Sequence, residues 1–170
     1  MTRQRESLAR LVPVLCRKYR GCGILVFGSV GRGEEKPNSD LDVIVVHDDE
    51  GELEWMPGSP LGEPGLNLDL AIFPQAALRR LAATRWFAFW EFAQAEVVHD
   101  PTGIARRNQT LIRERFEAYP EAAAMWKELM AAVSRSKRGS GVTLPYGGRA
   151  GVEAYLERLF VDKGTSASDS

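Results

Sequence analysis

The stretch that decides the fold is Phe27-Gly28-Ser29-Val30-Gly31-Arg32-Gly33, followed by Asn38-Ser39-Asp40-Leu41-Asp42-Val43-Ile44-Val45-Val46. A Gly-Ser turn precedes two aspartates that stand one residue apart, and ten residues separate Ser29 from Asp40. Glycine lets a ligand approach the backbone closely, and the free N–H groups that follow such a turn can bind an anion. The stretch therefore predicts a phosphate-binding turn that faces a pair of carboxylates.

Apolar runs on both sides of the turn predict two buried strands, at residues 24–27 and 41–46. Side chains alternate across a strand, so Asp40 and Asp42 should project to one face and their apolar neighbours to the other. Two carboxylates one pleat apart repel each other unless a cation lies between them. Oxygen ligands of this kind suit Mg²⁺ or Mn²⁺.

A third acidic residue, Asp69, stands within the alternating apolar run 66–73. An acidic residue in an apolar strand is costly unless it has a partner or a function. If this strand pairs beside the strand of Asp42, Asp69 can join the carboxylate pair and complete a two-metal site. The alternative is an exposed residue on an edge strand.

With this turn, this spacing and these carboxylates, residues 20–75 resemble the nucleotidyltransferase superfamily related to DNA polymerase β, and most closely its minimal nucleotidyltransferases. The family pattern is Gly-Ser, ten residues, Asp-x-Asp and a later strand with one more acidic residue. Five residues match this pattern position by position: Gly28, Ser29, Asp40, Asp42 and Asp69.

The resemblance implies that a nucleoside monophosphate, AMP from ATP in the family's usual case, is transferred to a hydroxyl with release of pyrophosphate. It assigns Asp40, Asp42 and Asp69 to the metal ions and to catalysis, with Asp69 beside the attacking hydroxyl. It also implies that Gly28 and Ser29 bind the nucleotide. Arg32 and Ser39 are added as nucleotide-binding residues because of their positions in the chain.

Three functions stay open on this evidence. The acceptor can be a small molecule such as an aminoglycoside-like antibiotic, over which a helical tail could close. It can also be a protein, as when an antitoxin AMPylates a tyrosine of its partner toxin. The third is a catalytically silent nucleotide-binding or scaffold protein, against which the three carboxylates argue.

Composition is compatible with an enzyme of this size. The chain has 170 residues, is 44% hydrophobic and has a net charge of −1, so it has no overall electrostatic attraction for nucleic acid. Two cysteines without metal spacing, no signal peptide and no apolar run as long as a membrane span favour a cytoplasmic protein with reduced thiols. The acceptor, the base and the oligomeric state stay open.

The predicted fold is α/β (α+β), a small mixed sheet with helices on one face and a helical C-terminal extension. We expect a nucleotidyltransferase domain at 1–98, the extension at 99–163 and a disordered tail at 164–170. Beside the three motif strands, the patterns predict helices at 3–19 and 74–94, a strand at 96–99 and a loop at 48–65. Asp100 and Pro101 should begin a helix that ends near residue 118, and two more helices should span 120–138 and 149–160.

Overall fold

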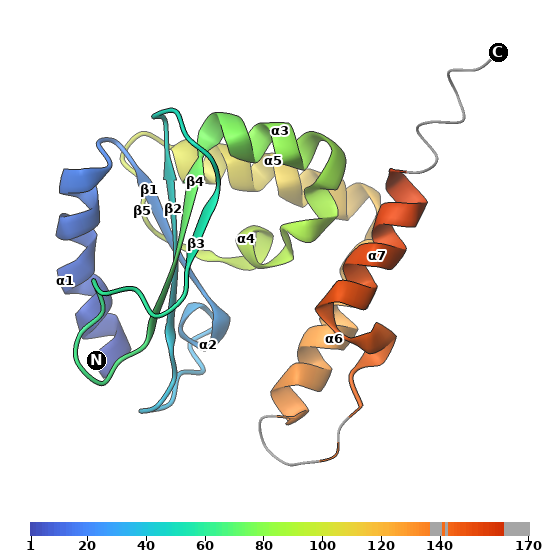
Figure 1. Ribbon diagram of the computed structural model, residues 1–170, viewed down its shortest axis with the longest axis horizontal. Coiled ribbons are helices and arrows are strands. Elements are labelled where there is room, and N and C mark those ends of the chain that lie inside the picture. The colour runs from blue at the N-terminus through green and yellow to red at the C-terminus, as the bar shows by residue number, and fades with distance from the viewer. Residues whose placement is uncertain (137–140, 142, 162–170) are drawn as a thin grey trace. The chain divides into compact units, whose positions relative to one another are not determined.

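The computed structural model describes residues 1–136, 141 and 143–161. Its five-stranded sheet has the order β3-β4-β2-β1-β5 (Figure 1). The β2–β4 pair is parallel, whereas β1 pairs antiparallel with β2 and β5, and β3 pairs antiparallel with β4. This is the mixed sheet that the sequence predicts. The strands are β1 Gly23–Phe27, β2 Leu41–His47, β3 Glu54–Met56, β4 Leu68–Pro74 and β5 Glu96–His99.

Helices precede, interrupt and follow the strands, and the C-terminal part of the chain is helical as predicted. None of the helices in the described residues is long and apolar enough to span a membrane. The α-helices are α1 Arg3–Lys18, α2 Gly28–Gly31, α3 Gln75–Arg85, α4 Trp90–Gln94, α5 Ile104–Ala118, α6 Pro120–Ser136 and α7 Arg149–Phe160, with 3-10 turns at Trp86–Ala88 and Pro145–Gly147.

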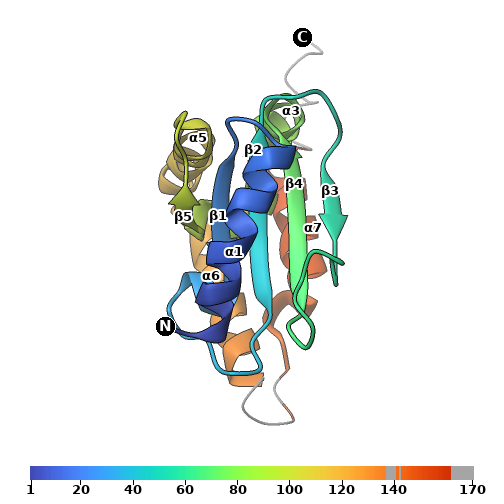
Figure 2. The same cartoon turned by 90° about the vertical axis from the view of Figure 1, so that its left-hand side faces the viewer.

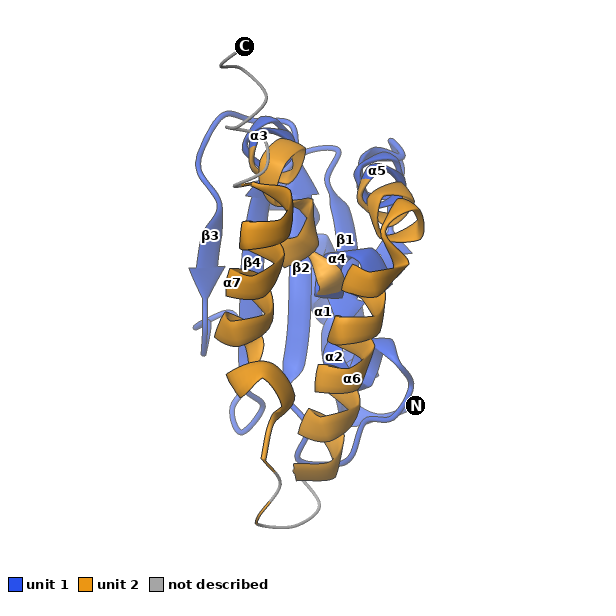
Figure 3. Cartoon of the chain, turned by 90° about the vertical axis from the view of Figure 1, so that its right-hand side faces the viewer, with its two compact units in different colours: residues 1–80, 91–111 blue, residues 81–90, 112–170 orange. Residues whose placement is uncertain are grey.

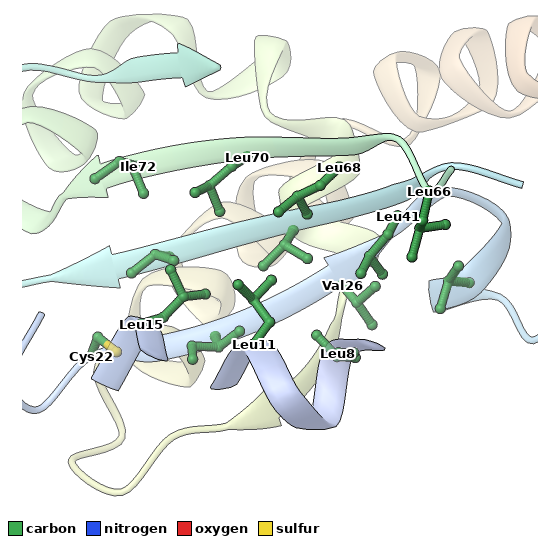
Figure 4. Packing of buried hydrophobic residues seen from close by; sticks show 14 residues of the cluster. Leu8, Leu11, Leu15, Cys22, Val26, Leu41, Leu66, Leu68, Leu70 and Ile72 are labelled. Atoms are coloured by element: carbon green, nitrogen blue, oxygen red, sulfur yellow. The ribbon is translucent and has the colours of Figure 1, made fainter. Parts of the chain in front are cut away.

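Helix α1 covers one face of the sheet because its apolar residues recur at helical spacing (Figure 2). Leu8, Leu11 and Leu15 are buried against the alternate residues of β1, β2 and β4 that point to this face (Figure 4). On the opposite face, the ring of Phe73 in β4 lies 5.9 Å from that of Phe92 in α4. Helices therefore lie against both faces of the sheet, which differs in this detail from the sequence expectation.

The chain divides into two compact units, coloured in Figure 3. The first comprises Met1–Arg80 and Glu91–Leu111 and contains the whole sheet; the second comprises Leu81–Trp90 and Ile112–Ser170. Within the second unit, the ring of Trp86 lies 5.0 to 5.4 Å from those of Phe116, Phe160 and Tyr119. The domain boundary at residue 98 stays a prediction, and the tail at 164–170 lies outside the described residues.

The predicted helix at 74–94 is wrong as a single element. Pro74 is the last residue of β4, and helix α3 ends at Arg85 before the 3-10 turn and α4. Four large aromatic residues between 86 and 92 are buried, and one continuous helix would turn some of them to solvent: Trp86, Phe87, Trp90 and Phe92. The break allows all four to be buried.

Two shorter segments also differ from the sequence expectation. The predicted loop at 48–65 contains the edge strand β3, which pairs with Leu70–Ile72 of β4. Helix α5 begins at Ile104, so Pro101 is not in its first turn. Asp100 nevertheless caps this helix, because its carboxylate accepts hydrogen bonds from the backbone N–H groups of Ala105 and Arg106, both at 3.0 Å.

Replacing Leu15 tests whether α1 is an integral part of the core. Leu15 is fully buried and its neighbour Val14 is 37% exposed, so Leu15→Ala should cost about 2–5 kcal/mol in the free energy of unfolding and Val14→Ala less than about 0.5 kcal/mol. Urea unfolding followed by circular dichroism measures both changes. Equal effects of the two substitutions would contradict the packing of α1 described here.

Candidate active site

The two strand aspartates are direct neighbours across the sheet. Asp42 of β2 is the register partner of Asp69 in β4 and of Phe27 in β1, so the three side chains share one row on one face. This face is opposite to the one covered by α1, because the alternate residues Leu41 and Val43 are buried in the core. Asp42 and Asp69 are both half-buried. The third acidic strand thus pairs beside the strand of Asp42, which is the condition under which Asp69 can join that carboxylate.

The Gly-Ser turn follows directly at the end of β1. Gly28 has a φ of +65°, which glycine adopts without strain, and a Cβ at this position would collide with Oδ2 of Asp42. A Cβ at Gly31 would lie 2.5 Å from the carbonyl oxygen of Val26. The absence of both side chains therefore lets the turn lie against the carboxylate of Asp42. Ser29 is half-buried in this turn.

Asp40 lies just outside strand β2, which begins at Leu41. It is exposed and immediately precedes β2, whose first residue Leu41 donates its N–H to the carbonyl of Asn67 at 2.9 Å. Within residues 1–136, 141 and 143–161, no three His, Cys, Asp or Glu side chains are gathered closely enough to hold a metal ion. The sheet itself therefore brings together Asp42 and Asp69, whereas Asp40 lies immediately before β2.

The donor set fits a hard divalent cation. Mg²⁺ is usually bound by one or two protein carboxylates, while water and substrate phosphates complete its octahedron. Asp42 and Asp69 supply two carboxylates from adjacent strands, and no softer nitrogen or sulfur ligand competes in their row. Two like charges side by side also favour a bound cation between them.

Asp69 is oriented by two hydrogen bonds to the same oxygen. Its Oδ1 accepts from the backbone N–H of Gly58 at 2.9 Å and from Nδ2 of Asn67 at 3.1 Å. Gly58 comes from the segment between β2 and β4, and Asn67 immediately precedes β4. Both bonds involve Oδ1, so they restrict rotation of the carboxylate, and no residue in the described part of the chain hydrogen-bonds to Oδ2.

The two remaining predicted nucleotide ligands have partners within the chain. Nε of Arg32 donates to Oε2 of Glu34 at 2.9 Å, and both side chains are exposed. The hydroxyl of Ser39 accepts from the backbone N–H of Lys36 at 2.8 Å and so closes the turn that leads to Asp40. A phosphate would have to compete with Glu34 for Arg32. The nucleotide contacts of Arg32 and Ser39 stay predictions.

The first turn of α1 holds the segments that carry the site, which sequence reasoning did not anticipate. Nε2 of Gln4, which is 1% exposed, donates to the carbonyls of Lys36 at 2.7 Å and Ser39 at 3.0 Å. The guanidinium of Arg5 donates to the carbonyl of Val30, and that of Arg3 donates to the carbonyl of Gly65 at 3.1 Å. Three consecutive side chains thus connect α1 to the Gly-Ser turn, to the segment before Asp40 and to the segment before β4.

A signal for Gln4 was present in the sequence. It stands at helical spacing before Leu8, Leu11 and Leu15, so it is a polar residue in an otherwise apolar stripe. A buried amide requires hydrogen-bond partners, and the carbonyls before Asp40 provide them.

Arg5 also forms an ion pair near this turn. It lies 3.6 Å from Glu35, and the pKa of Glu35 is lowered chiefly by a backbone hydrogen bond and then by the hydroxyl of Thr2.

Residues 8–88 match the family model of the nucleotidyltransferase domain, a segment that includes all seven predicted site residues. No curated protein matches the chain. Among solved structures, a nucleotidyltransferase-like protein from Exiguobacterium sibiricum 255-15 is 15% identical with a TM-score of 0.43, over 61% of this chain and 37% of that one. The chain thus spans little more than a third of that protein's length. By this match, residues 8–88 of the chain form a nucleotidyltransferase domain.

Proposed function

We propose that this chain is a metal-dependent nucleotidyltransferase that moves AMP from ATP onto a hydroxyl of a small molecule or a protein. The observation that carries the proposal is the Asp42–Asp69 pair beside the Gly28-Ser29 turn, within a segment that matches the nucleotidyltransferase domain. Each of these parts binds one component of the reaction. The fold alone does not name the acceptor.

The donor half of the reaction is assigned to the turn and to the carboxylates next to it. The backbone of Gly28 and the hydroxyl of Ser29 are positioned to bind the terminal phosphates, because no side chain at Gly28 separates them from Asp42. Asp40, Asp42 and Asp69 would hold Mg²⁺ or Mn²⁺. When bound, the metal neutralises the charge that develops on the entering and leaving oxygens.

The acceptor half is assigned to Asp69. The acceptor oxygen attacks the α-phosphorus and forms a new P–O bond, while the bond to the pyrophosphate oxygen breaks. The proton of the acceptor hydroxyl moves to Asp69, whose Oδ2 is directed away from the two hydrogen bonds on Oδ1. The pyrophosphate leaves with the electron pair of the broken bond, so atoms and charges balance.

Substitution of the strand aspartates separates donor binding from catalysis. Asp42→Asn should weaken binding of Mg·ATP at least about tenfold, because one carboxylate of the cation site is lost. Asp69→Asn should lower the transfer rate by about 10²-fold or more, because an amide cannot accept the proton. Calorimetry measures the binding, and α-labelled ATP measures transfer. The exposed Asp49→Asn is the control. Unchanged Mg·ATP binding by Asp42→Asn would disprove the assignment of Asp42 to the cation site and would favour another function for this fold.

Gly28 and Gly33 form a matched pair that isolates the steric role of the turn. Both have positive φ, +65° and +69°, so an alanine at either should cost a similar backbone strain of about 1–2 kcal/mol. Only at Gly28 would the new Cβ meet Asp42, whereas nothing lies within 4 Å at Gly33. Gly28→Ala should therefore weaken Mg·ATP binding well beyond the effect of Gly33→Ala, measured by calorimetry on the folded proteins. Equal losses would mean that contact with Asp42 is irrelevant.

A further inference from the structure

We propose that Trp55 is the acceptor-binding platform of this enzyme, on which a ring with an apolar face stacks and presents the acceptor hydroxyl. The inference rests on the proposed function and deepens it, because it names the residue that selects the acceptor and the shape of the group that this residue binds. The shared chemistry is a ring with an apolar face, and a phenol or a sugar can supply it.

Trp55 lies on the same face of the sheet as the two strand aspartates. Its register partner in β4 is Ala71, which stands two residues after Asp69 and therefore points to the same side. The indole of Trp55 lies 6.3 Å from the ring of Phe27, with an angle of 45° between the ring planes. Phe27 belongs to the row of Asp42 and Asp69, so the aromatic pair adjoins the carboxylates.

The exposure of Trp55 is not explained by packing of the core. It is 54% exposed, whereas the other three tryptophans, all within the described residues, are 0 to 6% exposed. The next residue, Met56, packs against the core on the α1 side of the sheet. The edge strand β3 thus anchors itself through Met56 and presents Trp55 to solvent beside the site.

The order of the strands places Trp55 on the acceptor side. Entering and leaving oxygens lie roughly in line across the transferred phosphorus, so the acceptor approaches from the side opposite to the pyrophosphate. The Gly-Ser turn follows β1, Asp42 is in β2, Asp69 is in β4, and β3 is the strand beyond β4. A donor bound over the turn therefore leaves to the acceptor the β4–β3 side, from which the indole of Trp55 extends toward Phe27.

One short segment fixes both the platform and the proposed base. Gly58 stands three residues after Trp55, and its N–H donates to Oδ1 of Asp69 at 2.9 Å. A ring stacked on Trp55 would therefore be held in a constant relation to Asp69. Such positioning is what a transfer reaction requires of the acceptor hydroxyl.

The first test measures ring binding without turnover. Acrylamide quenching of tryptophan fluorescence should report mainly on Trp55, because the other indoles are buried. With Mg²⁺ and a non-transferable ATP analogue present, 4-methylphenol or methyl β-glucoside should shield Trp55, and 1-propanol should not. Shielding by the phenol identifies an aromatic acceptor, and shielding by the glucoside identifies a carbohydrate. If neither ring shields Trp55, the proposal is wrong.

The second test uses variants of the full chain with the probe that shields Trp55. Equilibrium dialysis with that labelled probe should show about tenfold or more weaker binding to Trp55→Ala, since an aromatic platform under a stacked ring is lost. Trp55→Phe should keep most of the affinity. Leu61→Ala, which removes a 42% exposed apolar side chain from the same connection, is the matched control and should bind like the wild type.

Measuring Mg·ATP binding distinguishes a failure of the Trp55 platform from a failure of the proposed function. All three variants should bind Mg·ATP as the wild type does, because neither Trp55 nor Leu61 is among the residues assigned to the donor, which are the Gly28-Ser29 turn and the aspartates. Loss of probe binding in Trp55→Ala with intact Mg·ATP binding supports the platform. Equal probe binding by Trp55→Ala and wild type overturns the platform while the proposed function stands. A wild type that binds no Mg·ATP overturns the proposed function itself.

Discussion

The parallel pairing of β2 with β4 is the constraint on which the site depends. Their register makes Asp42 and Asp69 partners, and the same register makes the alternate leucines and valines of both strands face α1. A slip of one residue would turn Asp69 into the core and its apolar neighbours to the carboxylate face. Burial of apolar surface, which drives folding, therefore also holds two like charges side by side. The free energy gained by burying the core offsets the repulsion between the two carboxylates. A bound cation would relieve this repulsion, which favours cation binding.

Helix α1 adds a second constraint, on the loops rather than the strands. Its apolar stripe binds it to the sheet, and Arg3, Gln4 and Arg5 in its first turn then hold segments from three parts of the chain. The guanidinium groups of Arg3 and Arg5 bind carbonyls of the protein itself, and Arg5 also binds the carboxylate of Glu96. Backbone segments around the site are thus fixed before any substrate binds, which reduces the entropy lost on binding.

The donor half was accessible from the sequence because each of its parts has a local signature. The Gly28–Ser29 turn needs glycine for its backbone, and Asp69 interrupts an alternating strand; the strand pairing then follows from buried apolar runs. Strand β3 has no such signature, because three residues in a segment rich in glycine and proline carry no period and depend on backbone pairing with β4. The contacts of Gln4 were hidden for a related reason, since they join residues far apart in the chain.

The segment that crosses from β2 to β4 has a consequence for how such a protein can change. Parallel neighbours cannot be joined by a tight turn, so a long connection between them is obligatory. Here that connection contains Trp55 and the Gly58 contact to Asp69, while the strands contain the carboxylates. Insertions and exchanges in a surface connection leave a sheet intact far more readily than changes in its strands do. Changes in the sequence of this crossover could therefore alter which acceptor is bound, while the carboxylates of the strands and their chemistry stay the same.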